Sequence, residues 1–187
     1  MKLIIEKITL KKALICTAIF AAFYILINFT EIGVAGLLKM TNGATILDFK
    51  FGYSTADAHN MITALGEQGR AFYLTKIIPI DFPFPLAYML FYAGWIALLV
   101  KHVAPSGAAK LLLTLPLLAM LSDWIENVGI IFILTQYPEI ADKAVALASA
   151  SGILKSLFTQ GSIIAIIVLL VIFIINKILI SVRKSKN

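Results

Sequence analysis

The stretch SDWIENVGI, residues 122–130, places acidic and amide side chains inside one of the most apolar runs of the chain. That run covers residues 111–134, and Asp123, Glu126 and Asn127 lie near its centre. Residues three and four apart share a helix face, so the three side chains are expected to form one patch near the middle of a membrane. Each acid there costs at least about 2.5–3.5 kcal/mol on insertion scales. We interpret Asp123 and Glu126 as candidate general acids or bases and Asn127 as a substrate-orienting group.

A purely structural role is the alternative for this patch. Asp123 and Asn127 would then only hydrogen-bond to neighbouring helices. Such contacts are usually made by Ser, Thr, Asn or Gln, so two acids and an amide on one face favour a functional site. Polar residues near the outer ends of the other apolar segments are further candidates for ligand binding. They are Glu31, Arg70, Asp81 and Lys155.

Asp81 lies in the proline-rich segment IIPIDFPFPLAY, residues 77–88. Each proline lacks an N–H and disturbs the preceding helical turn. In a membrane, freed carbonyls are tolerated where protein or a wet cavity satisfies them, and broken helices recur near binding sites. The sequence equally allows a bend at the membrane interface with Asp81 in headgroup water.

The whole chain has the composition of an integral membrane protein. It is 60% hydrophobic and 14% charged, whereas a soluble domain is about 45–50% apolar and about 25% charged. Four apolar segments, at about 13–38, 71–100, 111–136 and 153–180, reach the roughly 20 residues needed to cross a membrane. We expect an all-α integral membrane protein, a four-transmembrane-helix bundle forming a single domain over residues 1–187.

The outer segment 44–70, between the first two spans, has its own pattern. LDFKFGY, residues 47–53, alternates apolar and polar side chains, which predicts a short strand or extended edge. Ser54 and Asp57 then fit a capping box, and Gly66 or Gly69 is expected to end the helix that follows. This short amphipathic extracytoplasmic helix is expected to lie flat over the outer mouth of the bundle. Its apolar face consists of Ala58, Met61, Ile62 and Leu65.

The distribution of basic residues predicts the orientation. With four spans, both termini and the 101–110 loop share one side, which holds ten Lys and Arg residues against six on the other side, 16 in all. Cytoplasmic loops carry the excess of Lys and Arg. Both termini are therefore expected in the cytoplasm, with the protein in the plasma (inner) membrane.

Several classes of function are disfavoured by composition. The basic residues flank apolar segments instead of forming one patch, which suits lipid headgroups and argues against nucleic acid. The single Cys16 excludes an internal disulfide. His59 and His102 fall on opposite sides of the membrane, so a transition-metal site is not expected. Two or three acids alone are a weak signal for Ca²⁺ or Mg²⁺. We expect no metal and no other cofactor.

Polar residues of all four spans gather in their outer halves, while the inner halves are apolar, as in IIAIIVLLVIFII at 163–175. This distribution predicts a cup that binds a lipid or amphiphile, with acid/base chemistry as a further step. An alternative is a non-enzymatic membrane assembly or accessory protein whose acids pair with Lys155, Lys76 or Arg70. A small proton-coupled transporter is less favoured, because four spans without a repeat offer little machinery for alternating access. Membrane lipids are the expected partners, and a homodimer or larger membrane complex remains open.

Overall fold

The computed structural model describes residues 2–103, 107 and 111–185. Within those residues the chain is almost entirely helical and contains no strand. Four helical stretches are long and apolar enough to cross a membrane: Leu10–Met40, Gly66–Val103, Thr114–Gln136 and Asp142–Arg183. The expectation of an all-helical chain with four such helices is confirmed. Lys110 and Lys186, which contribute to the charge asymmetry, lie outside the described residues.

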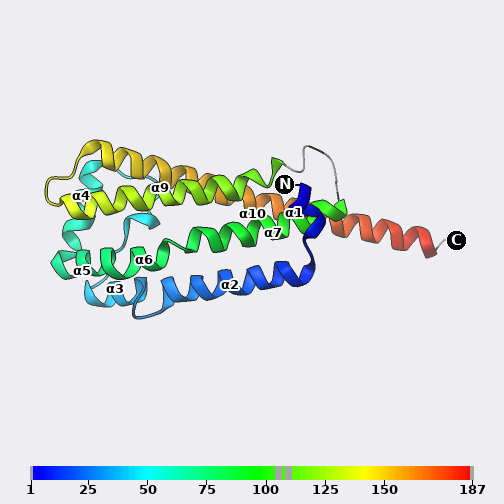
Figure 1. Ribbon diagram of the computed structural model, residues 1–187, viewed down its shortest axis with the longest axis horizontal. Helices are drawn as coiled ribbons and strands as arrows, with labels where there is room; N and C mark the ends of the chain where they lie inside the picture. Colours follow the sequence, from blue (N-terminus) through cyan, green and yellow to red (C-terminus); the bar gives the residue numbers. More distant parts are fainter. Residues whose placement is uncertain (1, 104–106, 108–110, 186–187) are drawn as a thin grey trace.

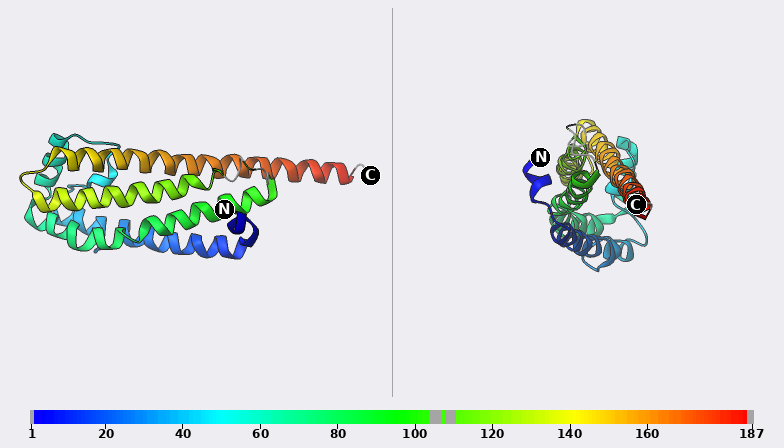
Figure 2. Two further views of the ribbon diagram at one scale, coloured as in Figure 1. Left: turned by 45° about the horizontal axis from the view of Figure 1, so that its top comes forward. Right: turned by 90° about the vertical axis from the view of Figure 1, so that its right-hand side faces the viewer.

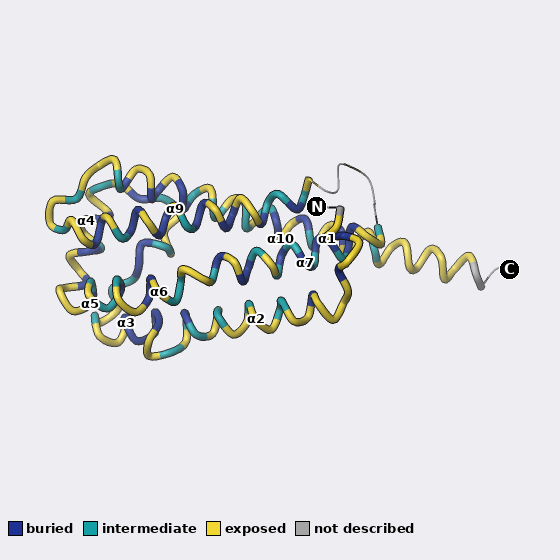
Figure 3. The backbone as a smooth tube through the Cα atoms, viewed as in Figure 1, coloured by how far each residue is buried: buried dark blue, intermediate teal, exposed yellow. Residues whose placement is uncertain are grey.

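The first span is a helix with few buried side chains. After the short α1 (Lys2–Lys7), α2 (Leu10–Phe29) begins where the Thr9 hydroxyl accepts a hydrogen bond from the Lys12 N–H at 3.3 Å. A turn then leads into α3 (Val34–Met40). Helix α2 is apolar around its whole circumference and buries only Ala13 and Ile27, so most of its surface is exposed (Figure 3).

The segment expected to be extended, residues 47–53, is instead a short 3-10 turn, η1 (Leu47–Phe49), followed by bends. The strand prediction was wrong because no second strand lies beside this segment to complete a hydrogen-bonded ladder. The segment is held against the bundle in another way. Leu47 is fully buried, and the Tyr53 N–H donates a hydrogen bond to the Ser149 hydroxyl at 2.8 Å.

The capping box at Ser54 is present and starts α4 (Thr55–Ala64). The Asp57 carboxylate accepts hydrogen bonds from the Ser54 N–H and hydroxyl, and these bonds lower the pKa of Asp57 below its usual range. The helix ends before Gly66, whose φ of 64° is a left-handed conformation that glycine adopts without strain. Ala58 and Ile62 are fully buried in the core.

The second span is a helical path with an irregular middle. It consists of α5 (Gly66–Phe72), a π-helical turn η2 (Tyr73–Ile77), α6 (Ile78–Asp81) and α7 (Phe84–Val103). The interruption coincides with Pro79, Pro83 and Pro85, which cannot donate backbone hydrogen bonds. The indole N–H of Trp124 donates to the Phe82 carbonyl at 2.9 Å and so ties this break to the third span.

The third and fourth spans are the long antiparallel pair α9 (Thr114–Gln136) and α10 (Asp142–Ser185). They pack along each other and against α7, whereas α2 packs mainly on α7 (Figures 1 and 2). From the sequence, Gly152, just before the fourth apolar segment, predicts a soft break in the helix. This prediction was wrong, because α10 is one continuous helix of 44 residues. Gly152 instead serves packing, as described below for Glu126. The C-terminal end of α10 projects beyond the other helices (Figure 1).

Three groups of buried side chains build the core. One gathers α3, η1, α4 and the neighbouring ends of the long helices around Leu37, Ile62 and Tyr73. A second lies at the opposite end of the bundle, around Ile96 and Val100. The third is aromatic and lies between them, with Phe20, Phe84, Phe91, Tyr88, Tyr92 and Trp124 among its members. Polar side chains occupy the region between the first and third groups.

Candidate functional site

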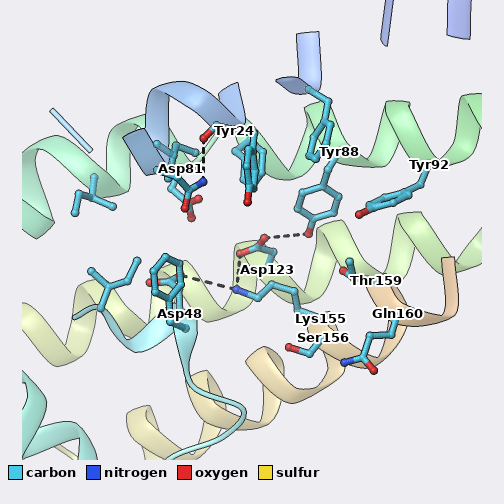
Figure 4. A pocket seen from close by; sticks show the side chains of 17 residues that line it. Tyr24, Asp48, Asp81, Tyr88, Tyr92, Asp123, Lys155, Ser156, Thr159 and Gln160 are labelled. Carbon is cyan, nitrogen blue, oxygen red and sulfur yellow. Dashed lines mark hydrogen bonds and ion pairs between the residues drawn. The ribbon is translucent and has the colours of Figure 1, made fainter. Parts of the chain in front are cut away.

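Five of the seven residues singled out in the sequence come together in one polar cluster: Asp81, Asp123, Glu126, Asn127 and Lys155. The ammonium of Lys155 is its centre. It lies 2.5 Å from Glu126 Oε2, 3.5 Å from Asp123 Oδ1 and 3.9 Å from Asp48 Oδ1. Dashed lines in Figure 4 join the Lys155 ammonium to Asp48 and to Asp123.

Helix α9 contributes three members from a single buried face. Asp123, Glu126 and Asn127 have the i, i+3 and i+4 spacing that aligns side chains on a helix. Asp123 is 3% exposed, and Glu126 and Asn127 are fully buried. The patch expected from their spacing therefore points into the bundle and not toward lipid.

Close contact between α9 and α10 brings Glu126 to Lys155. Gly152 precedes Lys155 by less than one helical turn and lies directly against the Glu126 carboxylate. A Cβ atom at position 152 would overlap the carboxylate oxygens. The glycine that the sequence suggested as a helix break thus makes room for the acid between the two helices.

Hydrogen bonds fix the other acids of the cluster. The Tyr88 hydroxyl donates to Asp123 Oδ2 at 3.0 Å, and the Asn127 amide donates to Asp81 Oδ2 at 2.7 Å. The proline-interrupted segment thus directs Asp81 into the bundle, where it meets α9. This placement favours the broken-helix interpretation of that segment over a bend in headgroup water.

Asp48 was missed in the sequence and belongs to the cluster. It is in η1, which dips into the bundle, and it accepts a hydrogen bond from the buried Tyr73 hydroxyl. The sequence shows Asp48 only as a polar position in an alternating segment. Its depth depends on how the 41–53 segment folds back, which is a tertiary property. Tyr88 was also missed, since a tyrosine in an apolar span has no distinguishing pattern.

Arg70 and Glu31 lie apart from the cluster. The Arg70 guanidinium stacks over the Tyr137 ring at 4.2 Å and donates to the Ile62 carbonyl at 3.3 Å. Glu31 forms an ion pair with Lys39 on the surface. Neither residue lines the cavity described next.

A cavity of about 370 Å³ adjoins the cluster (Figure 4). Polar side chains, including Asp48, Asp81, Asp123 and Lys155, form one part of its wall. The remainder is largely aromatic and aliphatic. Lining residues with exposed side chains mark its mouth, and these come from α2, η1 and α10. They are Tyr24, Phe49 and Gln160.

The cluster has more hydrogen-bond acceptors than donors. Within the cluster, Glu126 Oε1 and Asn127 Oδ1 are buried and have no hydrogen-bond donor among the described residues. Asp123 Oδ1 and Glu126 Oε2 have only the Lys155 ammonium, at 3.5 Å and 2.5 Å. Unpartnered buried acceptors are costly, so the site has capacity for a further donor.

Tyr53 borders the cluster from outside the spans. Its hydroxyl is buried without a hydrogen-bond partner among the described residues. Burial, reinforced by the negative charges of Glu126 and Asp48, raises the pKa of Tyr53 well above its usual range of 10. Tyr53 therefore stays neutral beside the acids.

No protein-family model matches this chain, and comparisons with curated proteins and with solved structures likewise gave no match. The chemistry of the cavity is the basis for any assignment.

Proposed function

We propose that the chain is an integral membrane protein that binds a lipid or other amphiphile in this cavity, with acid/base chemistry at Asp123. The observation that carries the proposal is the cavity itself, which joins a polar cluster to an aromatic and aliphatic wall. Ligand sites have this character, with mostly apolar linings and a few convergent polar groups. A ligand with a polar head and an apolar chain matches both parts.

The lengths of the helices indicate how deep in the membrane the site lies. Lys155 and Lys177 are 22 residues apart on α10, about 33 Å at 1.5 Å per residue, close to the roughly 30 Å of a hydrocarbon core. Asp123 is bonded to Tyr88, which lies 13 residues from Lys101 on α7, or about 20 Å. With Lys101 and Lys177 at the inner boundary, the cluster lies in the outer third of the membrane. That is further out than the midplane expected from α9 alone.

Access from the side fits the packing of the helices. Helix α2 packs on α7, and α10 packs on α9 and α7, while α2 and α10 are not a closely packed pair among the described elements. Both nevertheless line the cavity, and Tyr24 of α2 and Gln160 of α10 are exposed. An amphiphile dissolved in the outer leaflet would enter between these helices without leaving the lipid. In this proposal both termini lie in the cytoplasm and the protein lies in the plasma (inner) membrane.

The two acids of α9 have different roles in this proposal. A general acid or base must come within hydrogen-bond reach of the reacting group. Asp123 lines the cavity, whereas Glu126 does not and instead pairs with Lys155. Asp123 is therefore the catalytic candidate, and Glu126 positions Lys155. Tyr88, which donates to Asp123, orients the carboxyl.

Binding is tested by filling the cavity. Ser156 and Leu157 are neighbours on α10, but Ser156 lines the cavity and Leu157 is exposed on the outside. Native mass spectrometry of the protein in a neutral detergent should show a bound lipid-sized molecule in the parent and in Leu157→Trp. Ser156→Trp should lack it. A bound molecule retained equally by both variants, or absent from the parent, would contradict binding in this cavity.

A non-enzymatic accessory protein is the second candidate, favoured by the ion pairs that Lys155 forms with Asp48, Asp123 and Glu126. Asp123→Asn distinguishes the two, since it preserves shape and removes acidity. In a strain lacking the protein, the parent should restore the lipid profile and Asp123→Asn should not, although the variant still folds. Full restoration by Asp123→Asn would favour the accessory role.

A further inference from the structure

The cluster holds more carboxyl groups than basic side chains. Asp48, Asp81, Asp123 and Glu126 are four carboxyl groups, and Lys155 is the one basic side chain that forms ion pairs with them among the described residues, reaching Asp48, Asp123 and Glu126 but not Asp81. An opposite charge within about 4–6 Å stabilises the charged form of a carboxyl group. The site would therefore gain from a second positive group.

Hydrogen bonding points to the same kind of ligand. Asp123 lines the cavity, and its buried Oδ1 has only the Lys155 ammonium at 3.5 Å among the described residues. This oxygen can accept a hydrogen bond from a further donor. An ammonium group carries three N–H donors and no acceptor, so it supplies both the charge and the hydrogen bonds that are lacking.

Geometry allows a single ammonium to meet three carboxylates. Asp48, Asp81 and Asp123 each offer an oxygen, and these oxygens all lie within 4.8 Å of one another. Acceptors about 2.8 Å from a tetrahedral nitrogen are roughly 4.6 Å apart. We propose that the cavity takes an amphiphile with a cationic ammonium head, held by Asp48, Asp81 and Asp123, with its apolar chain leaving between α2 and α10.

This assignment rests on the proposed function and narrows it to one class of ligand. The aromatic wall supports the class, because Tyr24, Phe84 and Tyr88 line the cavity beside the acids, and aromatic faces attract organic cations. Ile27, Ile46 and Ile77 provide contact for a hydrocarbon chain.

A divalent metal ion fits less well. Ca²⁺ takes six to eight oxygen ligands, and Mg²⁺ demands near-octahedral geometry. Here Lys155 lies 3.5 Å from Asp123, so its charge opposes a divalent ion at the same carboxylate more than a monovalent head. The aromatic lining offers such an ion no ligands.

Three probes of equal chain length test the head group: dodecylamine, dodecanol and dodecanoate, titrated at pH 7 into the protein in a maltoside detergent. A ligand that binds the folded state raises the melting temperature, and at equal concentration the tighter ligand raises it more. We expect dodecylamine to raise it in the parent and to bind at least tenfold more tightly than dodecanol. Dodecanoate should have no effect.

Asp81→Asn and Asp48→Asn should each weaken dodecylamine binding at least tenfold. Both retain an acceptor for their present partners, Asn127 and Tyr73, so folding is preserved. Glu67→Gln is the matched control, since it removes an exposed acid remote from the cavity and should bind like the parent. An equal loss of dodecylamine binding in Glu67→Gln would show that the effect comes from the overall charge of the micelle. That result would overturn the proposed binding of an ammonium head by Asp48, Asp81 and Asp123.

Other outcomes separate the two proposals. Equal binding of dodecanol and dodecylamine would refute the ammonium head while leaving amphiphile binding intact. Failure of all three probes would refute both. Ca²⁺ or Mg²⁺ that displaces dodecylamine and alone stabilises the parent, but not Asp81→Asn, would show a metal site instead.

The ammonium can belong to a membrane lipid or to a simple amine. Native mass spectrometry after reconstitution in mixed bilayers of phosphatidylethanolamine and phosphatidylglycerol distinguishes them. Selective retention of phosphatidylethanolamine by the parent and not by Asp81→Asn supports a lipid head group. Dodecylamine binding without that selectivity supports a free amine of the same head-group chemistry.

Discussion

Lys155 is the residue on which the polar cluster depends. It is the cation that approaches Asp48, Asp123 and Glu126, and its side chain is only 16% exposed. Removing one partner of a buried ion pair leaves an uncompensated charge, which costs about 3–5 kcal/mol. Lys155→Met should lower the free energy of unfolding by about that amount, measured by denaturant unfolding in detergent micelles.

Two further variants control for this effect. Lys143→Met, at an exposed position of the same helix, should change stability by less than about 0.5 kcal/mol. Adding Glu126→Gln to Lys155→Met should recover part of the loss, because it removes one of the stranded charges. Equal losses of stability in Lys155→Met and Lys143→Met would show that groups other than Lys155 balance the charge of the cluster.

Tyr53 gives the protein a dependence on alkaline pH. Its folded-state pKa is raised above the ordinary value of 10, so folding favours the neutral hydroxyl. The resulting stability is fully present below pH 10 and is lost as pH rises toward the folded pKa. Tyr53→Phe should therefore unfold less readily than the parent above pH 10, by a difference that grows about 1.4 kcal/mol per pH unit. Parallel stability curves for the two proteins above pH 10 would show that Tyr53 is solvated.

At this scale the sequence indicated much of the cluster. Helical spacing placed Asp123, Glu126 and Asn127 on one face. The free-energy cost of placing acids in an apolar segment distinguished this patch from purely structural hydrogen bonds between helices. Asp48 could not be found, because nothing local shows that its segment folds into the bundle. Arg70 and Glu31 were expected at the site, but their long side chains bind local partners, Tyr137 and Lys39.

At the scale of the elements, the close packing of α9 on α10 determines where the acids lie. Gly152→Ala would drive a Cβ into the Glu126 carboxylate, and overpacking of a tight core costs about 1–3 kcal/mol. We expect a loss of that size in unfolding experiments. Gly161→Ala, on the same helix, is the control, because its Cβ would lie 3.6 Å from Leu115, an ordinary contact. If both variants unfold like the parent, the two helices have room to separate.

The elements also show where local pattern succeeds and fails. The Ser54 capping box was identified correctly, and of the two glycines expected to end the helix, Gly66 or Gly69, the first follows its end; both features depend on a few neighbouring residues. The strand at 47–53 and the break at Gly152 were wrong because each depends on a partner distant in sequence. Of the segment 44–70, Ile46, Asp48 and Phe49 line the cavity, while no residue of α4 lines it.

At the scale of the whole molecule, four apolar helices with extensive exposed apolar surface imply a membrane around the bundle. Orientation is tested in a Cys16→Ala background with single cysteines at Asn60 in α4 and Ser181 near the end of α10. Both positions are exposed. A membrane-impermeant thiol reagent applied to intact cells should label Asn60→Cys, and Ser181→Cys only after lysis. Labelling of both in intact cells would contradict the four-span topology.

Helix α10 can act as a lever. It runs without a break from Asp142, past Lys155, to an end that projects beyond the bundle (Figure 2). The 30 residues from Lys155 to Ser185 measure about 45 Å. A tilt of about 5° that widened the gap toward α2 would displace the far end by roughly 4 Å, calculated from that length. Binding of a ligand in a cavity near one membrane surface would thus move the end of α10 at the other surface.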